Sequence, residues 1–343
     1  MTKRFCLDLD MEDIRSWCEE RSFPSYRADQ LFKWLSSGVI DLDEMTNIPK
    51  DMRSKLKEDF LFENGMKIEH RFVSSIDGTV KLVFGMSDGH IIETVIMRYK
   101  QGLSICISSQ AGCRMGCTFC ASAHAGFGRN LTGGEMLGQV LLSQRFMNER
   151  IRSVVVMGIG EPFDNYDNLM RFIRLVTSEE GNNLGARHIT VSTCGLVPKM
   201  KEFTALKSQV NLSVSLHAPN DELRKKLMPV ANRYSLKELI EACDEYVKAT
   251  NRRITFEYSL FKGVNDDEKS ARELYRLLRG IHCHVNLIAA NEFPGSPYKR
   301  SSREHIESFR QLMEKYKINA TLRREMGTDI MAACGQLRRG LEQ

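Results

Sequence analysis

The sequence predicts an α/β protein built on a parallel sheet that is either open or curled into a partial barrel. The main observation is a series of six short β-rich segments that alternate with helical segments from about residue 103 onward. The length of 343 residues suggests about two domains, or one large α/β domain with extensions. A composition of 42% hydrophobic and 27% charged residues is typical of a soluble globular protein, which fits this class.

The alternating series is expected to determine where a site lies. The strand candidates are Leu103–Ser108, Ser153–Gly158, His188–Ser192, Val210–Leu216, Ile254–Ser259 and His284–Ile288. The helix candidates between them include Glu135–Arg150, Leu236–Lys248 and Asp267–Leu278. In barrels of this kind the chemistry occurs at the C-terminal ends of the strands. We therefore expect functional residues directly after the strand candidates.

The remaining segments are expected to form separate parts of the molecule. The predicted parts are an N-terminal helical domain (1–65), a β extension (66–100), the barrel (101–290) and a C-terminal extension (291–343). Apolar residues recur at helical spacing over Tyr26–Leu35, and Asn47–Pro49 marks the start of another helix.

Turn signals define the β extension and the C-terminal extension. Ser75–Gly78 and Ser87–Gly89 are hairpin-turn sequences between β-rich runs. The C-terminal extension opens with Asn291–Pro297, a loop by composition, and continues with a helix and the strand-like Ala320–Arg323.

Composition excludes several classes of protein. The longest apolar runs, such as Val154–Met157, are far shorter than the ~20 residues of a membrane helix. The N-terminus turns acidic within ten residues and lacks the apolar region of a secretory signal. Ten cysteines are too few for a disulfide scaffold, so we expect a reducing cytoplasm, where clustered cysteines serve metal binding or catalysis.

Positive charge is unevenly distributed along the chain. The segment Arg98–Arg152 has seven basic and only two acidic residues. A solvated helix face is one interpretation of such an excess. Because several of these residues flank a cysteine cluster in a Gly-rich loop, a site that faces a polyanion is the other.

Three cysteines follow the first strand of the series at the spacing C-x3-C-x2-C. Cys113, Cys117 and Cys120 can hold a [4Fe–4S] cluster through three irons, which leaves the fourth iron without a protein ligand. A zinc site would need a fourth Cys or His, and His124 stands four residues after Cys120, so zinc remains an alternative.

A second glycine-containing motif follows the next strand. Met157–Pro162 contains a GxG pair, but it lacks the third glycine and the downstream acid of a dinucleotide-binding fingerprint. A glycine beside the carboxylate of Glu161 suits a different role, which is close approach to a ligand's ammonium group.

The sequence closely resembles the RlmN/Cfr family of radical-SAM RNA methyltransferases over nearly the whole chain. The motifs that carry the resemblance are CISSQAGCRMGCTFC, MGIGEP, ITVSTCG, SVSLHAPNDELRKKLMP, GVNDD, NEFPGSPY and DIMAACGQL. The resemblance implies an α/β fold with a radical-SAM partial (β/α)6 barrel, a small N-terminal helical domain, a short β extension and a C-terminal tail. It also implies one [4Fe–4S] cluster on Cys113, Cys117 and Cys120, whose open iron chelates S-adenosylmethionine.

The same resemblance assigns the other site residues. The positions that match the family's S-adenosylmethionine-binding residues are Gly160, Glu161, Ser192, Ser215, Leu216, His217 and Asn291. Cys334 matches the methyl-carrying cysteine, Cys106 the resolving cysteine and Glu93 the proposed base. The implied reaction is ping-pong, with two S-adenosylmethionine molecules per turnover, a protein–RNA crosslink, and a disulfide that forms on product release. Packing is the expected role of the remaining cysteines, Cys6, Cys18, Cys194, Cys243 and Cys283.

The family contains two branches that differ in the adenine atom they methylate. Gly160–Pro162, His217–Asn220 and Asn291–Gly295 resemble the RlmN branch, which acts on position 2, rather than the Cfr branch, which acts on position 8. The implied substrates are 23S rRNA near the peptidyl-transferase centre and tRNA beside the anticodon. An electron donor such as flavodoxin, no membrane and a monomeric state are expected. Position-8 methylation, a radical-SAM enzyme that acts on protein, and a zinc-stabilised RNA-binding module are the alternatives.

Overall fold

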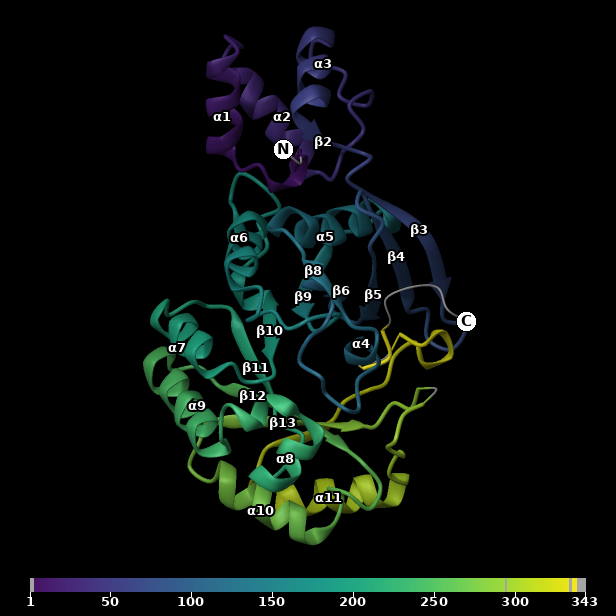
Figure 1. The fold of residues 1–343 in the computed structure, drawn as a ribbon, viewed down its shortest axis with the longest axis vertical. Helices are drawn as coiled ribbons and strands as arrows, with labels where there is room; N and C mark the ends of the chain where they lie inside the picture. Colours follow the sequence, from purple (N-terminus) through teal and green to yellow (C-terminus); the bar gives the residue numbers. More distant parts are fainter. Residues whose placement is uncertain (1–2, 294, 333–334, 338–343) are drawn as a thin grey trace.

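The computed structural model describes residues 3–293, 295–332 and 335–337, which form a small and a large lobe (Figure 1). The small lobe contains the helices α1 (Met11–Glu20), α2 (Tyr26–Ser36) and α3 (Lys50–Asp59). The helix expected over Tyr26–Leu35 is confirmed, and Pro49 immediately precedes α3 as predicted. A two-residue strand β2 (Phe60–Leu61) follows α3 and pairs in parallel with β1 (Arg4–Phe5).

One mixed sheet of ten strands forms the large lobe, with the order β14-β13-β12-β11-β10-β9-β6-β5-β4-β3. Its parallel strands are β6 (Gly102–Ile107), β9 (Ile151–Val156), β10 (Ile189–Thr193), β11 (Asn211–Ser215), β12 (Ile254–Leu260), β13 (Cys283–Ala289) and β14 (Ala320–Leu322). The six predicted strands and the strand-like C-terminal segment are therefore confirmed. Because β14 and β3 are its two edges, the sheet is open rather than closed into a barrel.

The expected β extension continues this same sheet. Its strands are β3 (Met66–Val73), β4 (Val80–Met86) and β5 (Ile91–Tyr99). They pair antiparallel with one another, and β5 pairs antiparallel with β6. The predicted hairpin turns connect β3 to β4 and β4 to β5, so the extension adds three strands beside the first strand of the parallel series.

Helices cover the outside of the parallel strands (Figure 1). They are α5 (Gly133–Met147), α6 (Tyr166–Thr177), α7 (Val197–Ala205), α8 (Asp221–Leu227), α9 (Leu236–Thr250), α10 (Glu268–Leu278) and α11 (Arg303–Lys315). Capping boxes at Thr132 and Ser235 explain where α5 and α9 begin. The helix expected over Glu135–Arg150 ends earlier than predicted because Asn148 adopts a left-handed conformation.

Buried aspartate contacts join the small lobe to the large one. Asp8, in the short 3-10 turn Cys6–Asp8, accepts hydrogen bonds from the Gly134 amide (2.6 Å) and the Thr132 hydroxyl (2.7 Å) at the start of α5. A carboxylate at this helix end satisfies an unpaired amide and interacts favourably with the helix dipole. Arg171 of α6 donates to the Asp8 carbonyl and, at 2.6 Å, to the Asp13 carboxylate. In addition to these polar contacts, the two lobes share one contiguous hydrophobic core.

No helix in the described part of the chain combines the length and the apolar character that crossing a membrane requires.

The junction between the lobes gives a stability prediction. A Cβ atom on Gly134 would lie 2.3 Å from the Asp8 backbone nitrogen and 2.5 Å from the Leu7 carbonyl carbon, so the small lobe would have to shift. Although alanine favours helix, we expect Gly134→Ala to lower the free energy of unfolding by ~1–3 kcal/mol. Anaerobic thermal melting measures the effect. Gly181→Ala is the control, since its Cβ would meet nothing closer than 3.5 Å. Equal melting temperatures for the two variants would contradict the prediction.

Candidate active site

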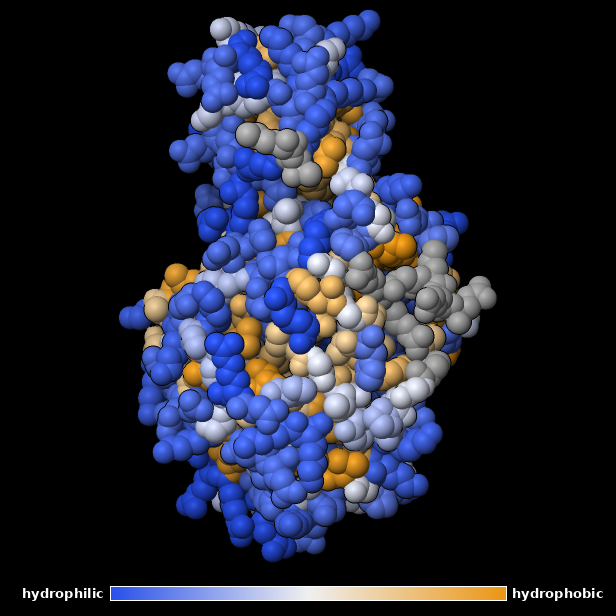
Figure 2. Space-filling model, viewed as in Figure 1, coloured by the Kyte–Doolittle hydropathy of each residue, from blue (hydrophilic) through white to orange (hydrophobic). Residues whose placement is uncertain are grey.

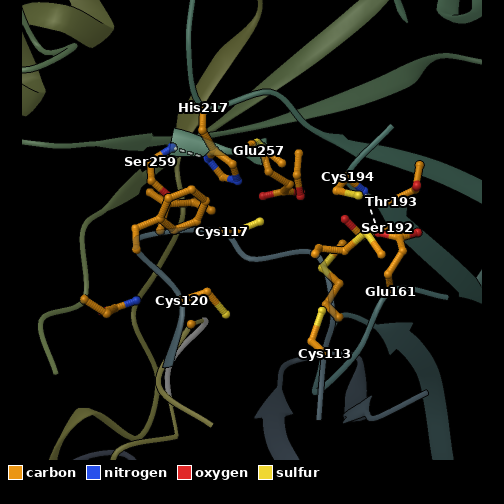
Figure 3. A pocket seen from close by; sticks show the side chains of 18 of the residues that line it. Cys113, Cys117, Cys120, Glu161, Ser192, Thr193, Cys194, His217, Glu257 and Ser259 are labelled. Carbon is orange, nitrogen blue, oxygen red and sulfur yellow. Dashed lines mark hydrogen bonds between the residues drawn. The ribbon is translucent and has the colours of Figure 1, made fainter. Parts of the chain in front are cut away.

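An open cavity of about 970 Å³ lies at the C-terminal ends of the parallel strands, which is where the sequence analysis expected the functional residues. Figure 2 shows hydrophobic side chains gathered in the middle of the larger lobe, surrounded by hydrophilic ones. The predicted site residues that line the cavity are Cys113, Cys117, Cys120, Gly160, Glu161, Ser192, Ser215, His217 and Asn291. They come from the ends of four strands (β9, β10, β11 and β13) and from one loop, so the fold brings together residues that are far apart in the sequence (Figure 3).

Leu216 is the exception among the predicted cofactor-binding residues. Its side chain is fully buried in the main hydrophobic core and does not line the cavity. It follows β11 directly, between Ser215 and His217, and its amide donates a hydrogen bond to the Glu257 carbonyl (3.0 Å). The Leu216 side chain points away from the cavity because neighbouring residues of extended chain point in opposite directions. The role of Leu216 in binding the cofactor stays a prediction.

The cysteine loop lies between β7 (Gln110–Gly112) and α4 (Ala121–His124) and turns its thiols toward the cavity (Figure 3). Gly112 has a φ of +87°, and a Cβ atom there would lie 1.9 Å from the Gly126 carbonyl oxygen, so the start of the loop requires glycine. The Thr118 amide donates to the Leu227 carbonyl (3.0 Å). The Phe119 ring packs edge-on against His217, with ring centroids 4.8 Å apart, and anchors the loop to the opposite wall.

The donor set suits an iron–sulfur cluster. Burial raises the pKa of the Cys113 thiol to about 12 and also raises that of Cys117, so ligation by iron must replace a proton on these sulfurs. The described residues include no group of three or more His, Cys, Asp or Glu side chains close enough to hold a single metal ion. A [4Fe–4S] cluster is ligated at separate corners, so its three thiolates stand apart. His124 is not among the lining residues, and its Nε2 lies 3.2 Å from the Thr118 carbonyl oxygen.

Glu161 presents a fixed carboxylate at the end of β9. Its Oε1 accepts a hydrogen bond from the Phe163 amide (2.9 Å) and its Oε2 accepts one from the Cys194 amide (2.7 Å). Burial raises the pKa of this carboxyl group, so a bound ammonium group would favour its ionised form. Gly160 has a φ of +108°, and a Cβ there would lie 2.6 Å from the Gln110 Cβ. Residue 160 must therefore be glycine for this turn to adopt its left-handed conformation and to pack against Gln110.

His217 is held as a neutral hydrogen-bond donor. Its Nδ1 accepts a hydrogen bond from the Ser259 amide (3.0 Å), which leaves the proton of a neutral ring on Nε2. Burial lowers the pKa of His217 to about 3, so the ring is uncharged at neutral pH. The Asn265 amide group donates to the carbonyls of His217 and Ser259, and so fixes the two strand ends beside each other.

The cavity wall also contains polar residues that were not predicted as site residues, among them Glu257, Arg323 and Cys194. Glu257 of β12 accepts hydrogen bonds from Ser213 and Asn286, both at 2.9 Å, and its other oxygen lies 3.6 Å from Arg323 Nη1. Cys194 was expected only to pack, yet it lines the cavity and its amide orients Glu161. Its position directly after a predicted strand is a signal that could have identified it.

A smaller cavity of about 560 Å³ adjoins the first and shares four lining residues with it, which are Met157, Ile288, Asn291 and Arg323. Cys106 of β6 lines this second cavity together with Ala332 and Leu337 of the C-terminal tail. Cys334 lies outside the described residues, but residues on both sides of it border the two cavities, since Gly335 lines the larger one. Glu93 of β5 is buried and forms an ion pair with Lys81, with 3.1 Å between Nζ and Oε1.

Two sets of hydrogen bonds hold the tail in place. At its start, the Gly327 amide donates to Asp77 Oδ2 (2.9 Å) and the Ser75 amide donates to Asp329 Oδ2 (2.9 Å), so the β3–β4 turn grips the chain. Near its end, the Ala121 amide donates to the Gly335 carbonyl (2.8 Å), next to the cysteine loop. The tail therefore passes between the extension strands and the cysteine loop.

The basic stretch is more neutralised than its composition suggested. Four of its arginines form ion pairs: Arg98 with Glu149, Arg114 with Asp164, Arg129 with Asp88 and Glu135, and Arg145 with Glu44. These four arginines therefore have acidic partners within the fold, and a site that faces a polyanion stays a prediction.

The other cysteines mostly pack as expected. Cys6, Cys18 and Cys243 are buried in the main core, and Cys283 packs against it. All nine cysteines in the described part of the chain are free thiols.

Known proteins resemble this chain over almost its full length. Two family models match, the radical SAM superfamily over residues 107–275 and the ribosomal RNA large subunit methyltransferase N-terminal domain over residues 6–61. A probable dual-specificity RNA methyltransferase RlmN from Clostridium novyi (strain NT) is 50% identical over 334 residues, 97% of each chain. Another from Clostridium perfringens (strain 13 / Type A) is 52% identical and covers 97% of this chain and 96% of that protein.

A solved structure supports the same assignment. The crystal structure of a radical SAM methyltransferase from Sphaerobacter thermophilus matches with a TM-score of 0.94 and 45% identity, over 97% of this chain and 99% of that one. The open parallel sheet and the three-cysteine loop at its strand ends thus define a radical-SAM enzyme. Within that class, the chain belongs to the RlmN family of RNA methyltransferases, and the resemblance seen in the sequence is confirmed.

The hydrogen bonds between the β3–β4 turn and the tail can be tested directly. Asp77→Ala removes the acceptor for the Gly327 amide, a loss of about 1 kcal/mol, so exchange of amide hydrogens around Gly327 should accelerate about fivefold. Hydrogen-exchange mass spectrometry of tail peptides measures this change. Asp41→Ala is the control, because it removes a similar bond to the Asp43 amide in the small lobe. Unchanged exchange in the tail of Asp77→Ala would disprove the role of the turn.

Proposed function

We propose that this enzyme methylates carbon 2 of an adenosine in 23S rRNA, near the peptidyl-transferase centre, and in tRNA, beside the anticodon. The observation that carries the proposal is the adjacency of two cavities, one bordered by the cysteine loop and the other by Cys106 and the tail. The family membership and the names of the relatives, which are dual-specificity RNA methyltransferases, support the choice of substrates.

The target atom explains why the cavities must adjoin. Carbon 2 of adenine is an electron-poor amidine carbon, so it does not attack the methyl sulfonium of S-adenosylmethionine. In the proposed reaction a first S-adenosylmethionine methylates Cys334, and a second one generates the radical that activates this methyl group. Radical generation and methyl transfer then need neighbouring but separate places, which the two cavities supply.

Residues of the larger cavity would hold the cofactors. Cys113, Cys117 and Cys120 would bind the cluster, and the fixed carboxylate of Glu161 would accept the ammonium group of S-adenosylmethionine. The neutral His217, with its proton on Nε2, would donate to an acceptor of the same ligand, beside Ser192, Ser215 and Asn291. When bound and reduced, the cluster supplies the electron that cleaves S-adenosylmethionine to a 5′-deoxyadenosyl radical.

Residues around the smaller cavity would complete the transfer. The methyl group on Cys334 would lose a hydrogen atom to the radical and add to the ring, which crosslinks protein and RNA. The crosslinked adduct is itself a radical, and it would give one electron back to the oxidised cluster, so that the following steps move only protons and electron pairs. Glu93 removes the proton from the ring carbon. The Cys106 thiolate then attacks the Cys334 sulfur, the sulfur–methylene bond breaks, and its electron pair leaves with the carbon, which takes a proton to become the product methyl group.

The proposal extends to partners and surroundings. The Cys106–Cys334 disulfide must be reduced after each turnover, which suits the reducing cytoplasm, and a donor such as flavodoxin would reduce the cluster. We assign residues 1–65 as an accessory domain that grips RNA, residues 66–100 as a β extension, 101–290 as the radical-SAM domain and 291–343 as the methyl-carrying extension. The enzyme is expected to act as a monomer.

Mass spectrometry of nucleosides tests the proposed function. Anaerobic enzyme with a reductant and S-adenosylmethionine should convert adenosine in 23S rRNA fragments and in tRNA to 2-methyladenosine. Standards distinguish this product from 8-methyladenosine, which would instead identify position-8 chemistry. Unmodified RNA together with active cleavage of S-adenosylmethionine would overturn the proposal.

The two transfer cysteines give opposite predicted phenotypes. Cys334→Ala should abolish methylation and form no crosslink, because it has no methyl carrier. Cys106→Ala should trap the protein–RNA crosslink as a shifted gel band, because no thiolate releases it. Cys243→Ala, a buried cysteine of the core, is the control and should form product without a trapped band.

Each cluster cysteine should be required for iron binding. Substituting Cys113, Cys117 or Cys120 with Ala should reduce iron and sulfide below half of the wild-type content and bleach the brown colour, because a lost thiolate removes one of the three ligands. Iron and acid-labile sulfide assays on anaerobically purified protein measure this. The control variant Cys283→Ala should keep its cluster, since the Cys283 thiol on β13 packs against the main hydrophobic core. Full iron content in all three cluster variants would show that these thiols are not the ligands.

A further inference from the structure

We propose that Lys81 is a positioning residue for this reaction, which holds the Glu93 carboxylate in place as an ionised base on the face of the sheet that carries Cys106. Lys81 has no counterpart among the site residues expected from the sequence. The inference rests on the proposed function, in which Glu93 removes the proton from the crosslinked base.

The sheet register places these residues on one face. Lys81 of β4 pairs with Val95 of β5, and Val95 pairs with Cys106 of β6. Directly paired residues point to the same side of a sheet, so the three side chains form a row across three strands. Glu93 lies two residues before Val95 on β5 and therefore points to the same side. Val95 and Cys106 both line the smaller cavity, which identifies this side as the one that faces the chemistry.

The contact between Lys81 and Glu93 is short and largely shielded from solvent. Lys81 Nζ lies 3.1 Å from Glu93 Oε1, and the two side chains are 10% and 7% exposed. The Lys81 ammonium also lies 5.1 Å from the centre of the Phe72 ring on β3, a cation–π distance. The ammonium is thus held between an aromatic ring and the carboxylate, which restricts where the carboxylate can point.

Charge explains why a base in this position needs such a partner. A carboxyl group that loses most of its hydration favours its neutral form, and a neutral acid cannot accept a proton. An ammonium group in contact with it favours the carboxylate. A buried ion pair is weak evidence for a stabilising role, because desolvation of both charges offsets much of their attraction. A function in proton removal accounts better for this pair.

The step that depends on the pair is a simple proton transfer. The C–H bond at the target carbon breaks, its electron pair stays in the ring, and an O–H bond forms on Glu93. Lys81 does not touch the reacting atoms and acts only through its contact with Glu93. Without Lys81, the Glu93 carboxylate loses the contact that orients it, and the crosslink persists because the ring proton is removed more slowly.

The test compares variants of the full-length enzyme with its cluster. Lys81→Met keeps the length of the side chain and removes its charge, and Lys81→Arg keeps the charge. For Lys81→Met we expect the rate of RNA methylation to fall about ten- to a hundredfold, within the range of general base catalysis. We also expect a crosslinked gel band, while iron content, methylation of Cys334 and formation of 5′-deoxyadenosine stay unchanged. Lys81→Arg should restore the rate to within about threefold of the wild type and remove the band, since the charge is the property that matters.

Matched controls separate this inference from a loss of folding and from failure of the proposed function. Lys67→Met changes an exposed lysine of β3, whose Nζ lies 3.5 Å from Glu69, and should have no effect.

If Lys81→Met does not fold, Lys81→Gln decides in its place. If Cys106→Ala traps the crosslink but Lys81→Met methylates RNA at the wild-type rate, the role of Lys81 is overturned and the proposed function stands. Loss of the cluster or of 5′-deoxyadenosine formation in every neutral Lys81 variant would also overturn it. No crosslink in Cys106→Ala would overturn the proposed function itself.

Discussion

The pairing of strand β6 on both of its edges is the constraint on which the site depends. β6 pairs in parallel with β9 and antiparallel with β5, so it joins the parallel series to the three extension strands. This double pairing places Cys106 between Val95 and Val155 in one row of side chains. A slip of one residue would turn Cys106 to the opposite face, away from the tail. The cysteine loop begins soon after the same strand, so β6 sets the position of both cavities.

The larger cavity is built from polar groups whose orientation is fixed before any ligand arrives. Backbone amides at two strand ends hold the carboxylate of Glu161, and the Ser259 amide determines the tautomer of His217. Buried polar groups that are hydrogen-bonded in this way keep one orientation at little further cost. Such preorganisation directs a small charged ligand into a single pose above the cysteine loop.

Several charged residues form ion pairs that hold parts of the molecule together. Arg145 pairs with Glu44, and Arg171 pairs with Asp13, so two arginines of the large lobe bind acids of the small lobe. Arg129 bridges Asp88 and Glu135 near the cysteine loop. Of these pairs, Arg145–Glu44 and Arg171–Asp13 join the two lobes. The uneven charge along the chain therefore describes, in part, how the two lobes attach to each other.

The sequence by itself determined the features that depend on local patterns. Hydrophobic periodicity and turn residues predicted the strand series, Asn47–Pro49 marked the start of α3, and the spacing of Cys113, Cys117 and Cys120 indicated the cluster loop. Only the tertiary structure decided which distant side chains meet. The Lys81–Glu93 pair depends on the register of β4 against β5. The Glu257–Arg323 contact joins β12 to the residue after β14, across the intervening strand β13. Register and long-range packing arise from the sum of many contacts, so no short stretch of sequence encodes them.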